Sequence, residues 1–100
     1  MMRVRTTVKP SSIHGFGCFA DAPISAGELV WQYVAGFDQE DPLTLYDYPD
    51  NARFINHSIV PNTEPTTDGN TRAMQAIPSG TEITENYYQT VPALIGELGI

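Results

Sequence analysis

Two short stretches of this sequence combine residue types that commonly bind ligands. Gly15 and Gly17 flank Phe16, and glycines let a backbone adopt positive φ and approach a ligand closely. Asn56 and His57 are adjacent, and they offer an amide that both donates and accepts hydrogen bonds beside an imidazole. The residue types alone leave ordinary alternatives open, namely a tight turn at the glycines and a turn asparagine beside a satisfied buried histidine.

Two tyrosines are candidates for a hydroxyl or a ring that contacts a substrate. Tyr33 and Tyr87 each lie near the end of a run that is typical of a β-strand. Because the pKa of an ordinary tyrosine is about 10, a phenol at neutral pH is better suited to orient a partner than to act as a base. Aromatic rings also form walls for a lysine stem and attract cations by their faces. Both tyrosines would equally fit as buried packing residues.

The composition fits one acidic domain with a basic partner. The chain has 100 residues, a formal net charge of −7 and only five Lys and Arg, three of which precede Pro10. Because phosphate contacts need basic patches, we expect no direct nucleic acid binding. Acidity suits a basic protein or peptide rich in Lys and Arg, although solubility alone would also explain the charge.

The cysteine and histidine content limits the possible sites and compartments. Cys18 is the single cysteine, so no internal disulfide forms, and the sequence favours a reducing compartment, cytoplasmic or, in a eukaryote, nuclear. His14, Cys18 and His57 do not have metal-ligand spacing, so we expect no metal site. No apolar run is long enough to cross a membrane, so we expect no membrane partner.

Short β-like runs separated by Gly, Pro, Asp and Asn predict a mainly β fold with many short strands. Asp68-Gly69 is a hairpin turn signal, and Pro78-Ser79-Gly80 is a turn before the last run. The predicted strands are residues 3–8, 18–20, 28–35, 62–67, 70–76 and 82–88. Residues 37–50 are acidic and contain two prolines, which predicts a surface loop, and residues 92–98 predict a short helix.

Four separated segments, in the right order, resemble the SET-domain family of protein lysine methyltransferases. The most specific is Asn-His-Ser at residues 56–58 with Pro-Asn at 61–62, which closely resembles the family signature R-F-h-N-H-S-C-x-P-N. The others resemble its G-x-G entry motif, its I-x-x-G-E-h-h segment leading into a Tyr, and its closing G-E-E-h-T-x-D-Y motif. They occupy residues 12–20, 24–33 and 73–87.

The resemblance implies a SET-type fold, with several short-stranded small sheets, a knot-like C-terminal arrangement and few short helices. It implies a single minimal domain over residues 1–100, divided into an N-terminal portion (residues 1–36), a short insert (residues 37–50), a C-terminal portion (residues 51–88) and a tail (residues 89–100). The implied activity is methyl transfer from S-adenosylmethionine to lysine side chains of a basic protein substrate. The implied cofactor-binding residues are Gly15, Phe16, Gly17, Asn56 and His57, and the implied catalytic residues are Tyr87 and Tyr33, with Tyr33 lining the lysine channel.

Three positions depart from the family pattern. Ile59 replaces the usual cysteine of the signature, Thr81 the first glutamate of G-E-E, and Asn86 the usual aspartate. No cysteine-rich zinc segment follows Tyr87 in the sequence. The chain therefore also fits a catalytically inactive SET-like module that binds a peptide or partner, or a homodimer in which a neighbouring copy completes the channel.

Several charged and aromatic side chains near these motifs have expected secondary roles. We expect Arg53 to pair with an acid such as Glu82, or to reach the cofactor carboxylate. Tyr88 follows Tyr87 on a predicted strand, so it should face the opposite side and pack there. The acidic residues between 38 and 50 fit either a solvated loop or a docking rim for a basic peptide.

Overall fold

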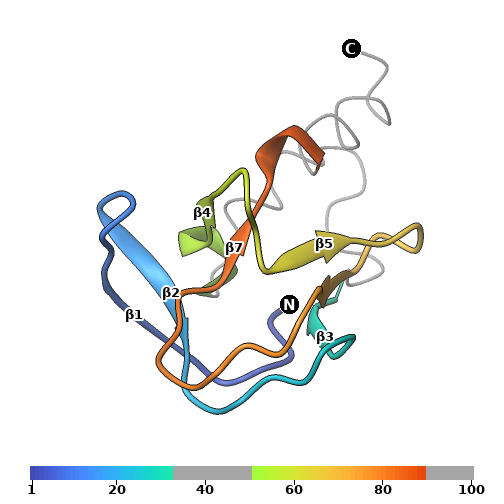
Figure 1. The fold of residues 1–100 in the computed structure, drawn as a ribbon, viewed down its shortest axis with the longest axis horizontal. Helices are drawn as coiled ribbons and strands as arrows, with labels where there is room; N and C mark the ends of the chain where they lie inside the picture. The colour runs from blue at the N-terminus through green and yellow to red at the C-terminus, as the bar shows by residue number, and fades with distance from the viewer. Residues whose placement is uncertain (33–50, 90–100) are drawn as a thin grey trace.

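Three small β-sheets make up the described region of the chain, residues 1–32 and 51–89, in the computed structural model (Figure 1). All the strands are short, and the mainly β character that the sequence predicts is confirmed. In the three sheets, β1 (Thr6–Pro10) pairs with β2 (Phe16–Ala20), β6 (Thr71–Ala73) lies between β3 (Leu29–Trp31) and β5 (Thr63–Pro65), and β4 (Asn56–His57) pairs with β7 (Thr84–Glu85).

Strands β1 and β2 form an antiparallel hairpin whose connection carries the predicted glycine turn. Because Pro10 pairs with Phe16, residues 11–15 form the loop between the strands. Gly15 ends this loop with φ of +44°, in the left-handed region that glycine adopts at little cost. The sequence predicted the first strand at residues 3–8, and the structure places it two to three residues later.

The hairpin of β5 and β6 confirms the turn signal at Asp68-Gly69. Gly69 has φ of +85°, and the carboxylate of Asp68 accepts hydrogen bonds from the hydroxyl of Thr66 and, at 3.1 Å, from the backbone N–H of Asn70. These local bonds lower the pKa of Asp68, with the Thr66 hydroxyl as the largest cause. The turn therefore holds its shape with its own side chains, and β6 continues to pair with β3 on its other side.

Strands β4 and β7 are parallel neighbours, although they lie far apart along the chain (Figure 1). The short 3-10 helix η2 (Asn51–Phe54) leads into β4. Buried Asn62 ties the next segment to β7, because its side-chain amide donates to the carbonyl of Glu82 at 2.8 Å and accepts from the N–H of Thr84 at 2.9 Å. The Pro-Asn end of the signature therefore fixes the position of β7.

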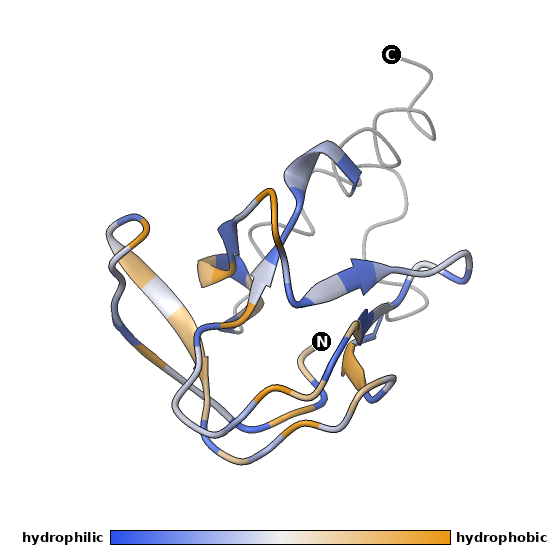
Figure 2. Ribbon diagram, viewed as in Figure 1, coloured by the Kyte–Doolittle hydropathy of each residue, from blue (hydrophilic) through white to orange (hydrophobic). Residues whose placement is uncertain are grey.

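The core joins all three sheets through small and branched apolar side chains. Figure 2 shows the apolar residues on β2 and β3 in orange. Ile24 and Ile77 lie 2% and 1% exposed, and each donates its N–H to the other's carbonyl at 2.8 Å. The buried set is Cys18, Ala20, Ile24, Val30, Ile55, Ala73, Ile77 and Ile83.

In the described residues, no helix is long and apolar enough to span a membrane.

The predicted strand over residues 82–88 is wrong at its C-terminal end. Strand β7 stops at Glu85, and residues 87–89 form a helical turn. Asn86 causes the change, because its side-chain oxygen accepts from the N–H of Tyr88 at 2.9 Å and its carbonyl accepts from Gln89 at 2.9 Å. Tyr88 is consequently 76% exposed rather than packed.

The other predicted elements lie partly or wholly outside the described residues. Of the strand predicted over residues 28–35, the structure describes β3 and ends at residue 32. The predicted loop over residues 37–50, the predicted helix over residues 92–98 and the acidic docking rim all lie outside the described residues.

Candidate active site

The loop between β1 and β2 is held by its first residue, Ser11. The backbone N–H of Ser11 donates to the carbonyl of Gly15 at 2.8 Å, which closes the loop at its base. The hydroxyl of Ser11 accepts from the N–H of Ile13 at 2.9 Å. The loop therefore presents Ile13 and His14 outward, and both side chains are exposed.

Asn56 connects this loop to strand β4. It is 9% exposed, and its amide nitrogen lies 3.1 Å from the carbonyl oxygen of His14 and 3.0 Å from that of Phe16. The same nitrogen lies 3.2 Å from the Ser11 hydroxyl and 2.8 Å from a carboxylate oxygen of Glu82. The glycine turn and the Asn-His pair, 40 residues apart in sequence, are therefore joined by direct hydrogen bonds.

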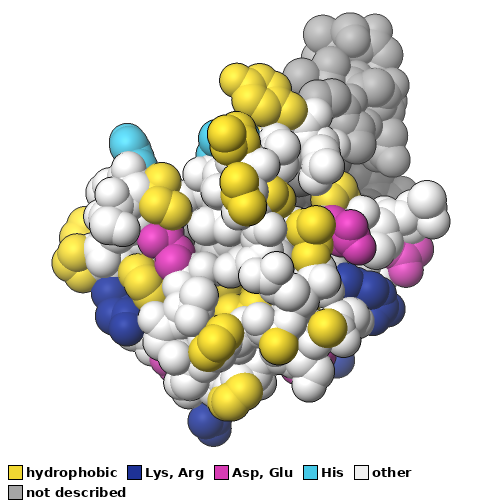
Figure 3. Space-filling model, in the orientation of Figure 1, with side chains coloured by type: hydrophobic (Ala, Val, Ile, Leu, Met, Phe, Trp, Pro, Cys, Tyr) yellow, Lys and Arg dark blue, Asp and Glu magenta, His cyan; other side chains and the backbone are white. Residues whose placement is uncertain are grey.

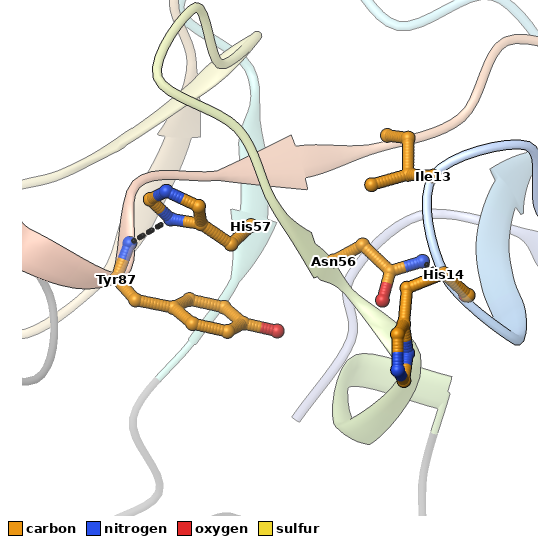
Figure 4. Close-up of a pocket in the computed structure, with 5 residues that line it drawn as sticks. All are labelled: Ile13, His14, Asn56, His57 and Tyr87. Atoms are coloured by element: carbon orange, nitrogen blue, oxygen red, sulfur yellow. Dashed lines mark hydrogen bonds between the residues drawn. The ribbon is translucent and has the colours of Figure 1, made fainter.

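His57 connects β4 to Tyr87. The backbone N–H of Tyr87 donates to Nδ1 of His57 at 3.0 Å (Figure 4), and the two rings lie 5.2 Å apart at a tilt of 48°. Since Nδ1 accepts, a neutral His57 carries its proton on Nε2, which is then a hydrogen-bond donor. The ring of Tyr88 meets the ring of His57 edge-on at 5.3 Å.

The phenol of Tyr87 points back to the start of β4. Its hydroxyl donates to the backbone carbonyl of Ile55 at 2.6 Å. Because that bond uses the hydroxyl proton, the oxygen lone pairs remain for a further donor. Burial, followed by the nearby Glu85 carboxylate, raises the pKa of Tyr87, so this group remains a neutral phenol at physiological pH.

The pKa of the Glu85 carboxyl group is also shifted. Burial raises the pKa of its carboxyl group from 4.5 to about 7. Glu85 lies on β7 opposite His57 in the parallel register, and two residues before Tyr87. A carboxyl group that titrates near neutral pH therefore lies beside the candidate catalytic tyrosine.

An open pocket of about 430 Å³ is lined by Ile13, His14, Asn56, His57 and Tyr87. Figure 4 shows the side chains of His57 and Tyr87 on one side and those of Asn56, Ile13 and His14 on the other. This volume lies within the range of small-molecule and cofactor sites. In Figure 3, both histidine side chains, drawn in cyan, reach the surface on the same side of the molecule.

Of the groups that were predicted to converge, Asn56-His57 and Tyr87 share one pocket, whereas Gly15 and Gly17 are not among its lining residues. Asn56, His57 and Tyr87 line the pocket directly. Phe16 is 58% exposed, so it is not a core residue, and its ring is open to a ligand. The cofactor-binding roles of these residues and of Gly15 remain predictions, and Tyr33 lies outside the described residues.

Gly17 has a different environment from the one that its motif suggests. It is buried, and a Cβ atom at this position would lie 2.3 Å from Oε2 and 2.7 Å from Cδ of Glu82. The space that a side chain would need is therefore occupied by a carboxylate. A direct contact of Gly17 with a cofactor remains a prediction, whereas its contact with Glu82 is a feature of the fold.

Sequence reasoning missed four residues of the site and assigned one partner wrongly. The expected ion pair between Arg53 and Glu82 is wrong, because Glu82 binds Ser11 and Asn56 instead. The guanidinium of exposed Arg53 lies 5.5 Å from the ring centroid of Phe54. The available signal for Glu82 was its match to the second glutamate of the family's G-E-E motif. The residues that were missed are Ser11, Ile13, His14 and Glu82.

Comparisons with known proteins show a shared fold. No protein-family model and no curated protein sequence matches this chain. A Plasmodium falciparum putative histone methyltransferase superposes with a TM-score of 0.56 at 22% identity, over 86% of this chain and 95% of that one. A humanized mutant of Chaetomium thermophilum Polycomb Repressive Complex 2 bound to an inhibitor gives a TM-score of 0.62 at 19% identity, over 84% of this chain and 15% of that one.

A third structure is the Chaetomium complex in an autoinhibited conformation bound to S-adenosylmethionine. It gives a TM-score of 0.63 at 18% identity and covers 99% of this chain. This chain spans only 17% of the length of that chain, but nearly all of the Plasmodium chain. At such low identities these likenesses establish the architecture and leave the chemistry to be argued from the residues.

Proposed function

We propose that this chain, which has the SET-type fold, transfers a methyl group from S-adenosylmethionine to lysine side chains of a basic protein substrate. The observation that carries the proposal is that Asn56, His57 and Tyr87 line one pocket, together with two residues of the loop between β1 and β2, Ile13 and His14. The relatives in fold include histone methyltransferases, and one of them is bound to S-adenosylmethionine.

The residues of the pocket fit the chemical groups of this cofactor. The amide oxygen of Asn56 can accept from an ammonium group, and Nε2 of a neutral His57 can donate to an acceptor. The exposed ring of Phe16 and the side chain of Ile13 offer apolar surface to a nucleoside. When bound, S-adenosylmethionine supplies the electrophilic methyl group on its sulfonium.

Tyr87 is placed to orient the lysine amine. The pKa of a free lysine is about 10.4, so its amine must lose a proton before its lone pair can attack the methyl carbon. S-Adenosylmethionine would supply the methyl group for the new N–C bond, its sulfur would keep the electron pair of the C–S bond, and the lysine proton would pass to solvent. The Tyr87 oxygen, whose proton is held by Ile55, offers its lone pairs to the amine N–H groups and to the partly positive methyl group.

The net charge of −7 supports a basic substrate. A cationic peptide is steered toward an acidic protein, and the effect weakens as salt screens the charges. The acidic residues between 38 and 50 are the proposed docking rim. Their role is a prediction that rests on the sequence.

Cofactor binding tests the proposal directly. A ligand that binds only the folded chain stabilises it by mass action, by about 2.7 kcal/mol at a concentration of about 100 times Kd. The melting temperature should therefore rise with S-adenosylmethionine and with S-adenosylhomocysteine, and not with adenosine triphosphate at the same concentration. A melting temperature that neither ligand changes would contradict the proposal.

A second candidate function is that of a catalytically inactive SET-like module that binds a peptide or partner. The observation in its favour is the exposure of Ile59, Val60 and Tyr88, at 78%, 81% and 76%. Exposed apolar side chains, yellow in Figure 3, are typical of interaction surfaces when they form a continuous patch. Cofactor binding without methyl transfer to any lysine-rich protein would favour this candidate. The same result would also fit a chain that needs a second copy of itself to complete the lysine channel.

A further inference from the structure

We infer that Glu82 is a positioning residue that fixes the orientation of the Asn56 amide, so that the Asn56 oxygen faces the pocket as a permanent hydrogen-bond acceptor. The group that it would receive is the ammonium of the methyl donor's amino-acid moiety. This inference rests on the proposed function, and it assigns to Glu82, Ser11 and Gly17 a task that residue patterns do not indicate.

The surroundings of the Asn56 nitrogen allow only one orientation of the amide. Two backbone carbonyls, those of His14 and Phe16, and the carboxylate of Glu82 lie within 3.1 Å of this nitrogen. All three groups can only accept a hydrogen bond. A flipped amide would place its oxygen against three acceptors, so the nitrogen must face them and the oxygen must face away.

Figure 4 shows the result of this orientation. The amide nitrogen of Asn56 is turned toward the loop that carries His14, and the amide oxygen is turned to the side where the Tyr87 hydroxyl and the His14 ring lie. Asn56 is one of the residues that line the pocket. A rigid, neutral acceptor in a partly buried site suits an ammonium group, because that group has only donors.

Glu82 is the charged member of this arrangement, and it is held on two sides. Its carboxylate accepts from the hydroxyl of Ser11 at 2.7 and 3.0 Å and lies 2.8 Å from the Asn56 nitrogen. It fits against Gly17 because no Cβ atom is there, and an alanine would overlap with it at 2.3 Å. The buried glycine on β2 therefore makes room for the carboxylate that orients Asn56.

Glu82→Gln would weaken this constraint on the orientation of the Asn56 amide. A carboxylate only accepts, but an amide presents either an oxygen or an NH₂ group. Glu82→Gln could therefore turn its NH₂ group toward the Asn56 nitrogen, which would remove one of the acceptors that hold the Asn56 amide in its orientation. We expect binding of a ligand that carries the ammonium group to weaken by about tenfold, the effect of losing one buried hydrogen bond.

Two ligands separate this effect from general damage to the pocket. S-Adenosylhomocysteine carries the amino-acid moiety, whereas 5′-deoxy-5′-methylthioadenosine keeps the nucleoside and the thioether without it. In calorimetric titrations, Glu82→Gln should weaken S-adenosylhomocysteine binding about tenfold and leave methylthioadenosine within about twofold of wild type. Glu64→Gln makes the same chemical change at an exposed carboxyl on β5 and should leave both affinities unchanged.

Other results would overturn the inference. An equal loss for both ligands would mean that Glu82 supports the pocket in general, and no loss for either would mean that Asn56 is oriented without it. If Glu82→Gln does not fold, Gly17→Ala provides the test, because its Cβ atom would displace the Glu82 carboxylate. It should also weaken the binding of S-adenosylhomocysteine and leave that of methylthioadenosine unchanged. A wild-type chain that binds neither ligand would remove the proposed function, and the inference with it.

Discussion

The hydroxyl of Tyr87 donates a 2.6 Å hydrogen bond to the carbonyl of Ile55, the residue directly before Asn56. The bond joins the end of the closing motif to the start of the Asn-His segment, and it uses the phenol proton on the protein itself. The oxygen lone pairs are thereby fixed in direction beside the pocket. Because burial and Glu85 raise the pKa of Tyr87, this arrangement holds across the physiological pH range.

Tyr87→Phe should lower kcat for methyl transfer by about a hundredfold, the usual effect of removing one transition-state contact, with little change in cofactor affinity. The ring remains to pack against His57, so only the hydroxyl is lost. Tyr88→Phe is the matched control, because Tyr88 is 76% exposed. Kinetics with a lysine-rich protein and calorimetry with S-adenosylhomocysteine would measure the two effects, and undiminished kcat in Tyr87→Phe would refute the assigned role.

Glu85→Gln should raise stability at pH 8 and change it little at pH 4. Burial raises the pKa of Glu85 from 4.5 to about 7 in the folded chain, so between these values the folded chain binds more protons than the unfolded chain. Stability therefore falls as pH rises through this window, and the loss is complete above the folded-state pKa. The shift corresponds to at most about 3 kcal/mol.

Urea unfolding of wild type and Glu85→Gln at pH 4, 6 and 8 would measure this dependence. Glu64→Gln, at an exposed site on β5, controls for the change in net charge. If the free energy of unfolding of wild type and Glu85→Gln had the same pH slope between the two pKa values, the carboxyl group would not be perturbed in this way.

Asn62→Ala should destabilise the fold by about 3 kcal/mol. Its side chain is 9% exposed and satisfies the carbonyl of Glu82 and the N–H of Thr84, which the alanine would leave without these partners. Because both groups flank the segment that leads to Tyr87, methyl transfer should fall as well. Thermal unfolding measures the first effect, and a melting temperature indistinguishable from that of wild type would contradict the structural role of Asn62.

Neutralising the five acidic residues of the proposed rim should raise KM for a lysine-rich peptide at low salt and leave kcat unchanged. Charge attraction acts on encounter and weak binding rather than on the chemical step, and screening removes it at high salt. An unchanged KM at low salt would reject the rim. The residues are Asp38, Glu40, Asp41, Asp47 and Asp50.

The features that depend on local chemistry could be predicted from the sequence. The Asp68-Gly69 turn forms with its own side chains, and the glycine turn before β2 follows from the positive φ of Gly15. The order of the motifs also indicated the fold, because each segment keeps its place along the chain. The two turns require only neighbours in sequence, which is why residue patterns were sufficient to predict them.

Of the three features that were not predicted, two depend on contacts between distant residues and one depends on a local cap. Glu82 was assigned to Arg53, but its partner Ser11 lies 71 positions away, in a loop whose closure places the hydroxyl there. The contact between Gly17 and the Glu82 carboxylate was not predicted, because nothing in the sequence shows which side chain fills the free space at this glycine. The side chain of Asn86 accepts a hydrogen bond from the N–H of Tyr88 and begins a helical turn that ends the last strand. The alternation of residues in the sequence does not show this bond.

Mass spectrometry of lysine-rich proteins after incubation with the chain and S-adenosylmethionine tests the central claim most directly. The wild-type chain should add the mass of a methyl group to lysine residues, and Tyr87→Phe should give a far smaller yield at equal cofactor occupancy. Cofactor-saturated wild-type chain that leaves every protein of a broad basic panel unmodified would contradict this claim.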